Sequence, residues 1–125
     1  MVYVIRQAIT DHYALYQGDS VEVLRGIPDG TVDLTVSSPP FQSLYVYSAS
    51  ERDIGNCKSV DEFMEHLAYL ASELYRVTRT GRLCAFHCAQ VPAMLERDGY
   101  IGMKDLRGDL IRLFQSVGFI YHSEV

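Results

Sequence analysis

Strand-like apolar runs alternate with helix-like spacing along most of the chain. The run at residues 13–16 predicts a strand that Gly18 ends, and Asp19 then suits the N-cap of a short helix. Residues 32–36 are β-branched and mostly apolar, which is typical of a buried strand in a parallel sheet. Two prolines stop this strand, because neither can donate a hydrogen bond to a sheet ladder.

The clearest helix pattern begins at Ser59, which forms a capping box with Glu62. Apolar residues then recur every three or four positions and mark one buried face: Val60, Phe63, Met64, Leu67, Leu70, Ala71 and Leu74. Gly81 is predicted to end this helix as its C′ residue. Residues 42–58, before the helix, lack periodicity and are predicted to form a mobile surface loop.

The remaining pattern predicts a strand at 83–89, a helix at 105–117 that Gly118 ends, and a last strand at 119–125. No repeat or linker divides the chain, so we expect one domain. The order of elements predicts an α/β fold with a largely parallel sheet and flanking helices. In such folds, ligands bind beyond the carboxyl ends of the strands.

The composition and net charge exclude several classes of protein. Of the 125 residues, 48% are hydrophobic and 22% charged, which is a globular balance rather than a disordered one. The net charge of −5 excludes a generally basic nucleic-acid binder, so contact with DNA would need a local patch. The chain has no apolar run long enough for a membrane span and no secretion signal. Its three cysteines are an odd number, which does not indicate a disulfide framework. We therefore expect a cytoplasmic protein without a membrane partner.

The residues that follow the strand at 32–36 carry the most suggestive chemistry: Ser38, Pro39, Pro40 and Phe41. The prolines direct the backbone and leave carbonyl oxygens available as acceptors, while Ser38 adds a hydroxyl and Phe41 a flat apolar face. Together these groups could hold a planar molecule with an exocyclic amino group. In the alternative interpretation, the prolines only end the strand and Phe41 joins the core.

Three segments resemble the amino-terminal part of amino-methylating DNA methyltransferases: residues 18–24, 27–30 and 32–41. These enzymes transfer a methyl group from S-adenosylmethionine to N4 of cytosine or N6 of adenine, as in restriction-modification systems. Their signature is Asp, Ser or Asn, two prolines and an aromatic residue, which stands here as Ser38-Pro39-Pro40-Phe41. The form that begins with serine looks more like the N4-cytosine group. The resemblance covers about residues 15–125 and implies a Rossmann-like methyltransferase half-domain.

The resemblance also implies roles for these residues. Ser38, Pro39, Pro40 and Phe41 would form the catalytic motif, in which Ser38 Oγ and the Pro39 carbonyl accept hydrogen bonds from the target amine. Phe41 would stack on a base flipped out of the DNA. S-adenosylmethionine would be the cofactor and DNA the partner.

One part of the family pattern is missing. The family's cofactor turn has Phe-x-Gly-x-Gly spacing, and no two of the nine glycines lie two residues apart. Where the catalytic motif comes first, the glycine-rich motif lies much later in the chain. We therefore expect residues 1–125 to form the amino-terminal catalytic part of a longer, permuted methyltransferase. Asp19 is a candidate for contacting the cofactor, with helix capping as the alternative.

Other candidate residues favour simpler interpretations. In a strand, Cys84 and Cys88 would lie about 13 Å apart with His87 on the other face, too far apart for one tetrahedral ion. Two basic groups could contact phosphate, or could instead serve helix ends and solubility: Arg76, Arg79 and Arg82, and Lys104, Arg107 and Arg112.

Two rival hypotheses remain beside a methyltransferase. The first is a non-catalytic, DNA-associated or dimerising remnant of such an enzyme, and the second is an unrelated α/β domain. A half-sheet should also leave apolar surface uncovered, through which copies of the chain could associate as a homo-oligomer.

Overall fold

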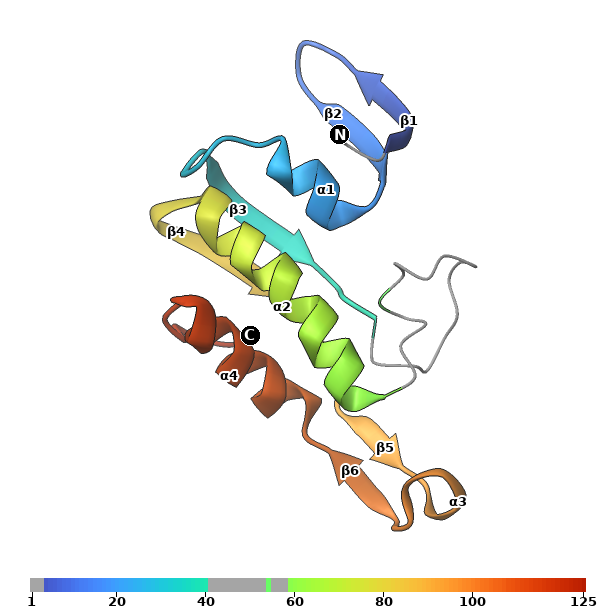
Figure 1. Cartoon of the computed structure of the whole chain (residues 1–125). Coiled ribbons are helices and arrows are strands. Elements are labelled where there is room, and N and C mark those ends of the chain that lie inside the picture. Colours follow the sequence, from blue (N-terminus) through green and yellow to red (C-terminus); the bar gives the residue numbers. More distant parts are fainter. Residues whose placement is uncertain (1–3, 41–53, 55–58) are drawn as a thin grey trace.

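The computed structural model describes residues 4–40, 54 and 59–125, and it has an α/β architecture (Figure 1). The elements in chain order are β1 (Val4–Ile9), β2 (Ala14–Gly18), α1 (Ser20–Arg25), β3 (Val32–Ser37), α2 (Val60–Val77), β4 (Thr78–Phe86), β5 (Val91–Ala93), α3 (Leu95–Asp98), β6 (Gly102–Lys104) and α4 (Leu106–Val117). Phe41 and, apart from Ile54, the predicted loop at 42–58 lie outside the described residues.

The described strands form two-stranded sheets of both kinds. β3 and β4 pair in parallel, with Leu34 opposite Leu83 and Ser37 opposite Phe86. β1 pairs with β2 and β5 pairs with β6 in antiparallel fashion. The prediction of a largely parallel sheet is therefore not confirmed. The short link between β1 and β2 explains part of the difference, because a parallel pair needs a crossover of a dozen or more residues.

Side-chain caps begin α1, α2 and α4 where the sequence predicts these helices to start. Asp19 Oδ1 accepts hydrogen bonds from the backbone N–H groups of Val21 and Glu22 at 3.0 and 3.2 Å, which starts α1. Ser59 Oγ caps α2 through the N–H of Glu62 at 3.1 Å. Asp105 caps α4, and Gly118 is its C-cap. These helix boundaries are set by local chemistry, so the sequence alone identifies them.

Some predicted boundaries are wrong. α2 ends at Val77 and the chain enters β4 directly at Thr78, so Gly81 is not a helix C′ residue. Gly81 instead adopts φ 79° inside β4, where the β3–β4 register shifts. β4 also ends at Phe86 rather than at residue 89.

The predicted last strand at 119–125 is wrong as well, because these residues adopt no strand structure. Phe119 packs its ring against Phe114 and Tyr75, with centroids 5.5 and 5.3 Å away. Phe119 thus serves ring packing on the helices instead of a sheet ladder, whereas Ile120 and Val125 are exposed. The elements β5, α3 and β6 lie in a region for which the sequence predicted none.

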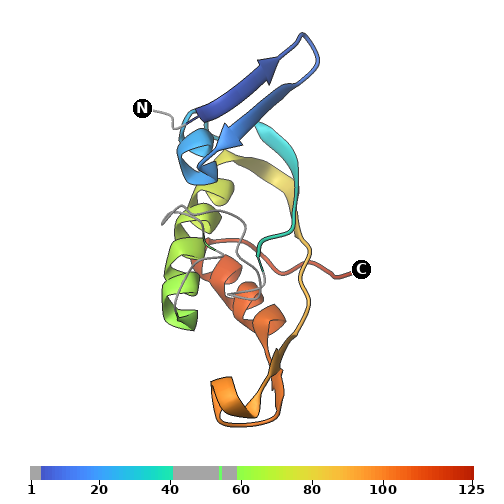
Figure 2. The same ribbon diagram turned by 90° about the vertical axis from the view of Figure 1, so that its right-hand side faces the viewer.

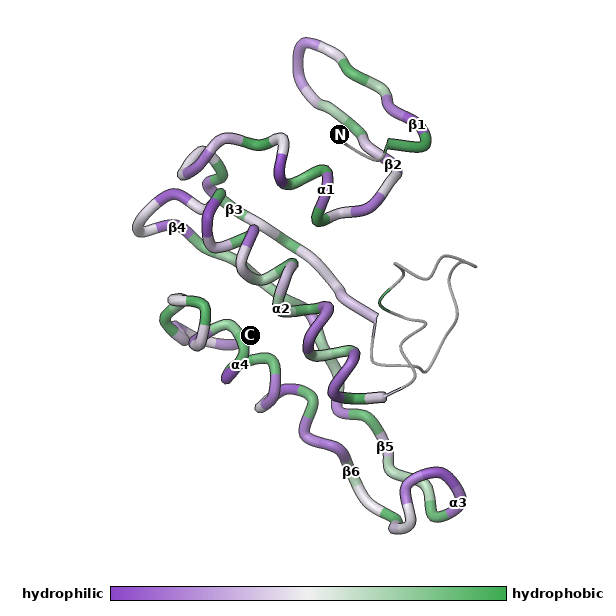
Figure 3. Tube along the Cα trace, viewed as in Figure 1, coloured by the Kyte–Doolittle hydropathy of each residue, from purple (hydrophilic) through white to green (hydrophobic). Residues whose placement is uncertain are grey.

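α2 and α4 cover one face of the β3–β4 pair (Figures 1 and 2). Hydrophobic and hydrophilic segments alternate along both helices (Figure 3). Hydrophobic residues of the two helices meet Val91 of β5 in a core cluster: Phe63, Leu67, Val91, Leu106 and Leu110. Phe86 of β4 faces the same layer, since its ring centroid lies 4.6 Å from that of Phe114. No described helix has the length and apolar character needed to cross a membrane.

The opposite face of the β3–β4 pair is uncovered, as the sequence predicts for a half-sheet. Side chains alternate between the two faces of a strand. Leu34 and Val36 of β3 are 58% and 76% exposed, and Leu83 of β4 is 54% exposed. We call the surface formed by Leu34, Val36, Leu83 and Ala85 the bare face.

Candidate active site

The carboxyl ends of β3 and β4 bring Ser38 and His87 together. Ser37 and Phe86 are register partners at the last positions of the two strands. One residue further on, the His87 backbone N–H donates to the Ser37 carbonyl oxygen at 2.8 Å. The Ser38 Oγ atom lies 3.0 Å from His87 Nδ1. Two residues that are 49 positions apart in sequence therefore form one hydrogen-bonded pair at the edge of the sheet.

This pair lies at the end of the bare face. The alternation that exposes Leu34 and Val36 continues to Ser38, and the alternation that exposes Leu83 continues to His87. Both side chains are exposed. The carboxyl edge of β3 and β4 therefore presents a hydroxyl and an imidazole to solvent.

The two prolines that follow Ser38 fix the direction of the backbone after it. Pro39 is buried and Pro40 is half-buried, whereas Ser38 before them is exposed. Because a proline ring fixes φ and supplies no N–H, the backbone leaves β3 in one direction and cannot extend the ladder. The prolines thus do end the strand, and in doing so they hold Ser38 at its edge. Phe41, the fourth predicted site residue, lies outside the described part of the chain.

His87 is the site residue that sequence reasoning missed. The sequence interpretation considered it only as a metal ligand beside Cys84 and Cys88. A usable signal was present, because parallel strands align their carboxyl ends: a polar residue directly after β4 should meet the one directly after β3. The misplaced end of β4, at residue 89 instead of Phe86, hid this relation.

Side-chain hydrogen bonds connect the segment after His87 to the start of α4. The Gln90 side chain donates from Nε2 to Asp105 Oδ1 at 2.8 Å and accepts at Oε1 from the Arg107 backbone N–H at 3.0 Å. Gln90 thereby joins the segment that carries His87 to the first turn of the helix.

The two described cysteines lie on the helix side of the sheet, where burial favours the protonated thiol. Burial raises the pKa of Cys84 to about 11, which outweighs the opposing hydrogen bond with Thr35. Burial also raises the pKa of Cys88. Metal binding requires the thiolate, so these shifts disfavour Cys84 and Cys88 as ligands. Among the described residues, no group of three or more His, Cys, Asp or Glu side chains is placed to hold a metal ion.

Asp19 lies apart from this sheet. It directly follows β2, which pairs with β1, and its Oδ1 atom caps α1. The capping interpretation is therefore confirmed. A role for Asp19 in cofactor binding stays a prediction.

Each residue of the two basic groups contacts a carboxylate. Arg76 bonds to Asp29 and Glu73 at 2.6 and 2.7 Å and also donates to the carbonyl oxygens of Leu24 and Ile27. The other pairs are Arg79 and Arg82 with Asp33, Lys104 with Asp98, Arg107 with Glu124, and Arg112 with Asp109. These contacts favour a structural role for the basic groups over phosphate binding.

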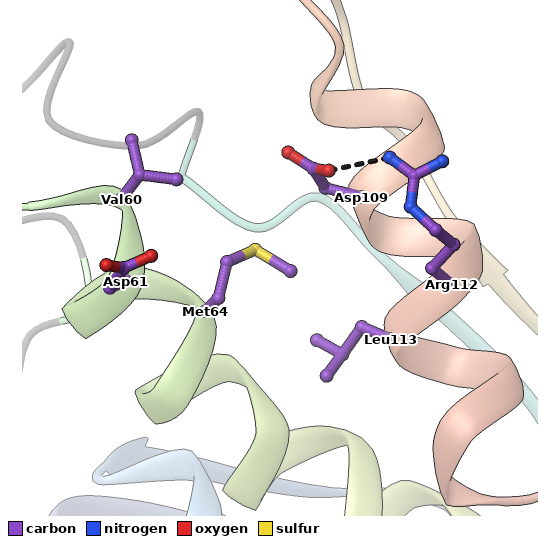
Figure 4. Close-up of a pocket in the computed structure, with 6 residues that line it drawn as sticks. All are labelled: Val60, Asp61, Met64, Asp109, Arg112 and Leu113. Carbon is purple, nitrogen blue, oxygen red and sulfur yellow. Dashed lines mark hydrogen bonds and ion pairs between the residues drawn. The ribbon is translucent and has the colours of Figure 1, made fainter.

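A hollow of about 490 Å³ lies between the first turns of α2 and the middle of α4 (Figure 4). Its lining consists of Val60, Asp61, Met64, Asp109, Arg112 and Leu113, with Arg112 paired to Asp109 at 2.7 Å. None of the residues at the ends of β3 and β4 lines it. The hollow belongs to the helix layer and not to the candidate active site.

Several known proteins are similar to this chain in sequence. No protein-family profile matches the chain. It is 37% identical over 68 residues to the type II methyltransferase M.SfiI of Streptomyces fimbriatus, a match that covers 54% of this chain. It is 40% identical over 63 residues to the type II methyltransferase M.Cfr9I of Citrobacter freundii, which covers 50% of this chain.

The chain is also similar in fold to a protein of solved structure. TTHA0409 of Thermus thermophilus, a proposed DNA modification methylase, matches with a TM-score of 0.64 and 25% identity in its complex with S-adenosyl-L-methionine. The match covers 82% of this chain and 38% of that protein. This chain has the fold of part of a methylase.

The extent of each match is also a finding. The chain spans 16% of M.SfiI and 21% of M.Cfr9I. The relatives thus contain far more sequence than the part that matches this chain.

Proposed function

We propose that this chain carries the catalytic-motif part of an S-adenosylmethionine-dependent DNA amino-methyltransferase. One observation carries the proposal: Ser38-Pro39-Pro40 lies at the carboxyl end of a parallel strand, in a chain whose relatives are type II DNA methyltransferases. In α/β folds that edge is where ligands bind. DNA is accordingly the proposed partner.

The proposed chemistry is hydrogen bonding to the target amine. Ser38 Oγ and the Pro39 carbonyl accept the two N–H hydrogens of an exocyclic amino group and so direct the nitrogen lone pair away from the protein. The bound cofactor supplies an electrophilic methyl group. Because the nitrogen becomes cationic as it is methylated, acceptor oxygens held in place beside it stabilise the developing charge. Phe41 would stack on the base, which must leave the duplex to reach this edge.

We propose that the described residues supply only part of the site for the cofactor. The acidic candidate, Asp19, uses its carboxylate to cap α1, and the hollow between α2 and α4 contains none of the motif residues. The nine glycines also lack Gly-x-Gly spacing. We therefore propose that the cofactor is held mainly by the part of the methyltransferase to which residues 1–125 do not correspond.

The serine at the first motif position favours N4 of cytosine over N6 of adenine, by resemblance to the N4-cytosine group. The bare face favours the alternative of a non-catalytic, dimerising remnant, because exposed Leu34, Val36 and Leu83 suit self-association. Methyl transfer to DNA separates the two hypotheses.

The test is Ser38→Ala in the complete protein that carries these residues. Transfer of a labelled methyl group from S-adenosylmethionine to duplex DNA is measured, and the digested product identifies N4-methylcytosine or N6-methyladenine. Ser38→Ala should lower kcat at least tenfold, or about 1.4 kcal/mol, with the circular dichroism spectrum unchanged. Ser116→Ala, an exposed serine on α4, is the matched control. Equal turnover of the two variants would exclude Ser38 as the acceptor, and an inactive wild-type protein would favour the remnant.

A further inference from the structure

We infer that His87 is a positioning residue that orients the Ser38 hydroxyl for the target amine. The inference rests on the proposed function and deepens it. It starts from the 3.0 Å contact between Ser38 Oγ and His87 Nδ1 at the open edge of the sheet. A serine at that edge without a partner would rotate its hydroxyl freely, whereas this one has a fixed partner on the neighbouring strand.

The chemistry of the two groups gives the direction of the hydrogen bond. A serine hydroxyl has one hydrogen to donate and two lone pairs to accept with. The target amine presents N–H donors, so Ser38 is useful only when its own hydrogen points elsewhere. In the neutral imidazole with its hydrogen on Nε2, Nδ1 is an acceptor and takes the Ser38 hydrogen. Both lone pairs of Oγ then remain for the amine.

The other tautomer has the opposite effect. An N–H on Nδ1 would donate to Ser38 Oγ, occupy one lone pair, and leave the hydroxyl hydrogen to face the N–H groups of the amine. Two donors would then face each other, and only one lone pair of Oγ would remain for the amine. The inference therefore assigns to His87 the neutral tautomer with Nδ1 unprotonated, which is a state that can be measured directly.

The backbone keeps the imidazole within reach. His87 N–H bonds to the Ser37 carbonyl at 2.8 Å, which continues the β3–β4 ladder by one residue. Gln90 ties the following segment to Asp105 and Arg107. Ser38 directly precedes Pro39, which is buried. The pair is thus held from both strands, while both side chains stay exposed to an incoming base.

The first experiment measures the tautomer in the 125-residue chain. Two-bond ¹⁵N–¹H correlation spectra at pH 8 should show the His87 ring with Nδ1 unprotonated and Nε2 protonated. In Ser38→Ala, the His87 Nδ1 signal should shift toward that of an imidazole without a partner, and the signals of His12 and His122 should stay in place. Protonated Nδ1, or a His87 signal that Ser38→Ala does not move, would overturn the inference.

The second experiment is a double-mutant cycle in the complete protein. His87→Ala should lower kcat for methyl transfer about tenfold and leave KM for DNA within about twofold. In the Ser38→Ala background, the same change should cost nothing further, because His87 acts through Ser38. His87→Asn, whose Oδ1 atom can accept near the position of Nδ1, should restore most of the rate, and His87→Gln should not.

The outcomes separate this inference from the proposed function. Equal losses from His87→Ala in both backgrounds would show that His87 acts independently of Ser38 and would overturn its positioning role. Wild-type rates in both His87→Ala and His87→Gln would overturn it as well. An inactive wild-type protein would instead overturn the proposed function, while the tautomer measurement still decides whether the Ser38–His87 hydrogen bond exists.

Discussion

Replacing Leu67 by alanine tests whether α2 and α4 form one packed layer beneath the candidate active site. Leu67 is 0% exposed and packs in the core cluster with Phe63, Val91, Leu106 and Leu110. Val91 begins β5, shortly after His87, so the cluster also holds the segment that carries the imidazole. Loosening the cluster should therefore reduce both the stability of the chain and the order of the site.

The size of the effect follows from this burial. Leucine-to-alanine changes in packed cores cost about 2–5 kcal/mol, and the side chain's complete burial suggests about 3 kcal/mol here. Domains of this size have total stabilities of about 5–15 kcal/mol, so the loss is a large fraction. At about 1–3 kcal/mol per molar urea, the unfolding midpoint should fall by about 1–3 M.

The assay is urea unfolding of the 125-residue chain followed by circular dichroism. Two variants serve as controls. Leu67→Met keeps most of the volume and should cost less than about 1.5 kcal/mol. Tyr69→Ala removes a residue of the same helix that is 56% exposed, and it should change stability by no more than about 0.5 kcal/mol. A loss for Leu67→Ala as small as that for Tyr69→Ala would refute tight packing of α2 against α4.

Three further predictions concern the cofactor, acid stability and association. The 125-residue chain should bind S-adenosylmethionine weakly or not at all, because it lacks Gly-x-Gly spacing and its Asp19 caps α1; micromolar affinity in a calorimetric titration would contradict this. Hydrogen bonding to Lys104, above all, lowers the pKa of Asp98 from 3.8 to about 2, so its stabilising contribution is present above pH 4 and is lost as the pH falls through 2. Urea midpoints measured from pH 5 to pH 2 should show this loss in the wild type and a smaller one in Asp98→Asn; identical slopes would refute it. Copies of the chain should associate through the bare face, and Val36→Lys should raise the monomer fraction in light scattering while Tyr69→Lys leaves it unchanged; a monomeric wild type would exclude such association.

Sequence reasoning succeeded where a structural feature depends on neighbours in the chain. Asp19, Ser59 and Asp105 cap helices because each side chain reaches N–H groups two or three residues ahead. The strand at 32–36 follows from its β-branched, apolar composition, but the prediction that it is buried is wrong, because Leu34 and Val36 are exposed. The buried face of α2 follows from the spacing of its apolar residues. The same local reasoning placed Ser38 and the prolines at the end of a strand, where the structure has them.

It failed where the outcome depends on residues far away in sequence. Gly81 looks like a helix stop, but α2 ends four residues earlier and Gly81 lies where the pairing of β4 with β3 shifts register. Residues 119–125 have a strand-like composition, yet Phe119 finds aromatic partners on the helices. His87 gains its significance only from Ser38, and the register between two strands decides that contact.

The separation of 49 residues between Ser38 and His87 also affects the order in which parts of the chain fold during synthesis. A ribosome adds about 5–20 residues per second, so His87 is made about 2–10 s after Ser38. The hairpin of β1 and β2 can close within microseconds of its synthesis, but the parallel pair must wait until α2 and β4 exist. During that interval Leu34 and Val36 have no strand beside them. We expect the nascent chain to be most vulnerable to chaperone capture and misassociation at this stage, and the candidate active site to form only after β4 has been made.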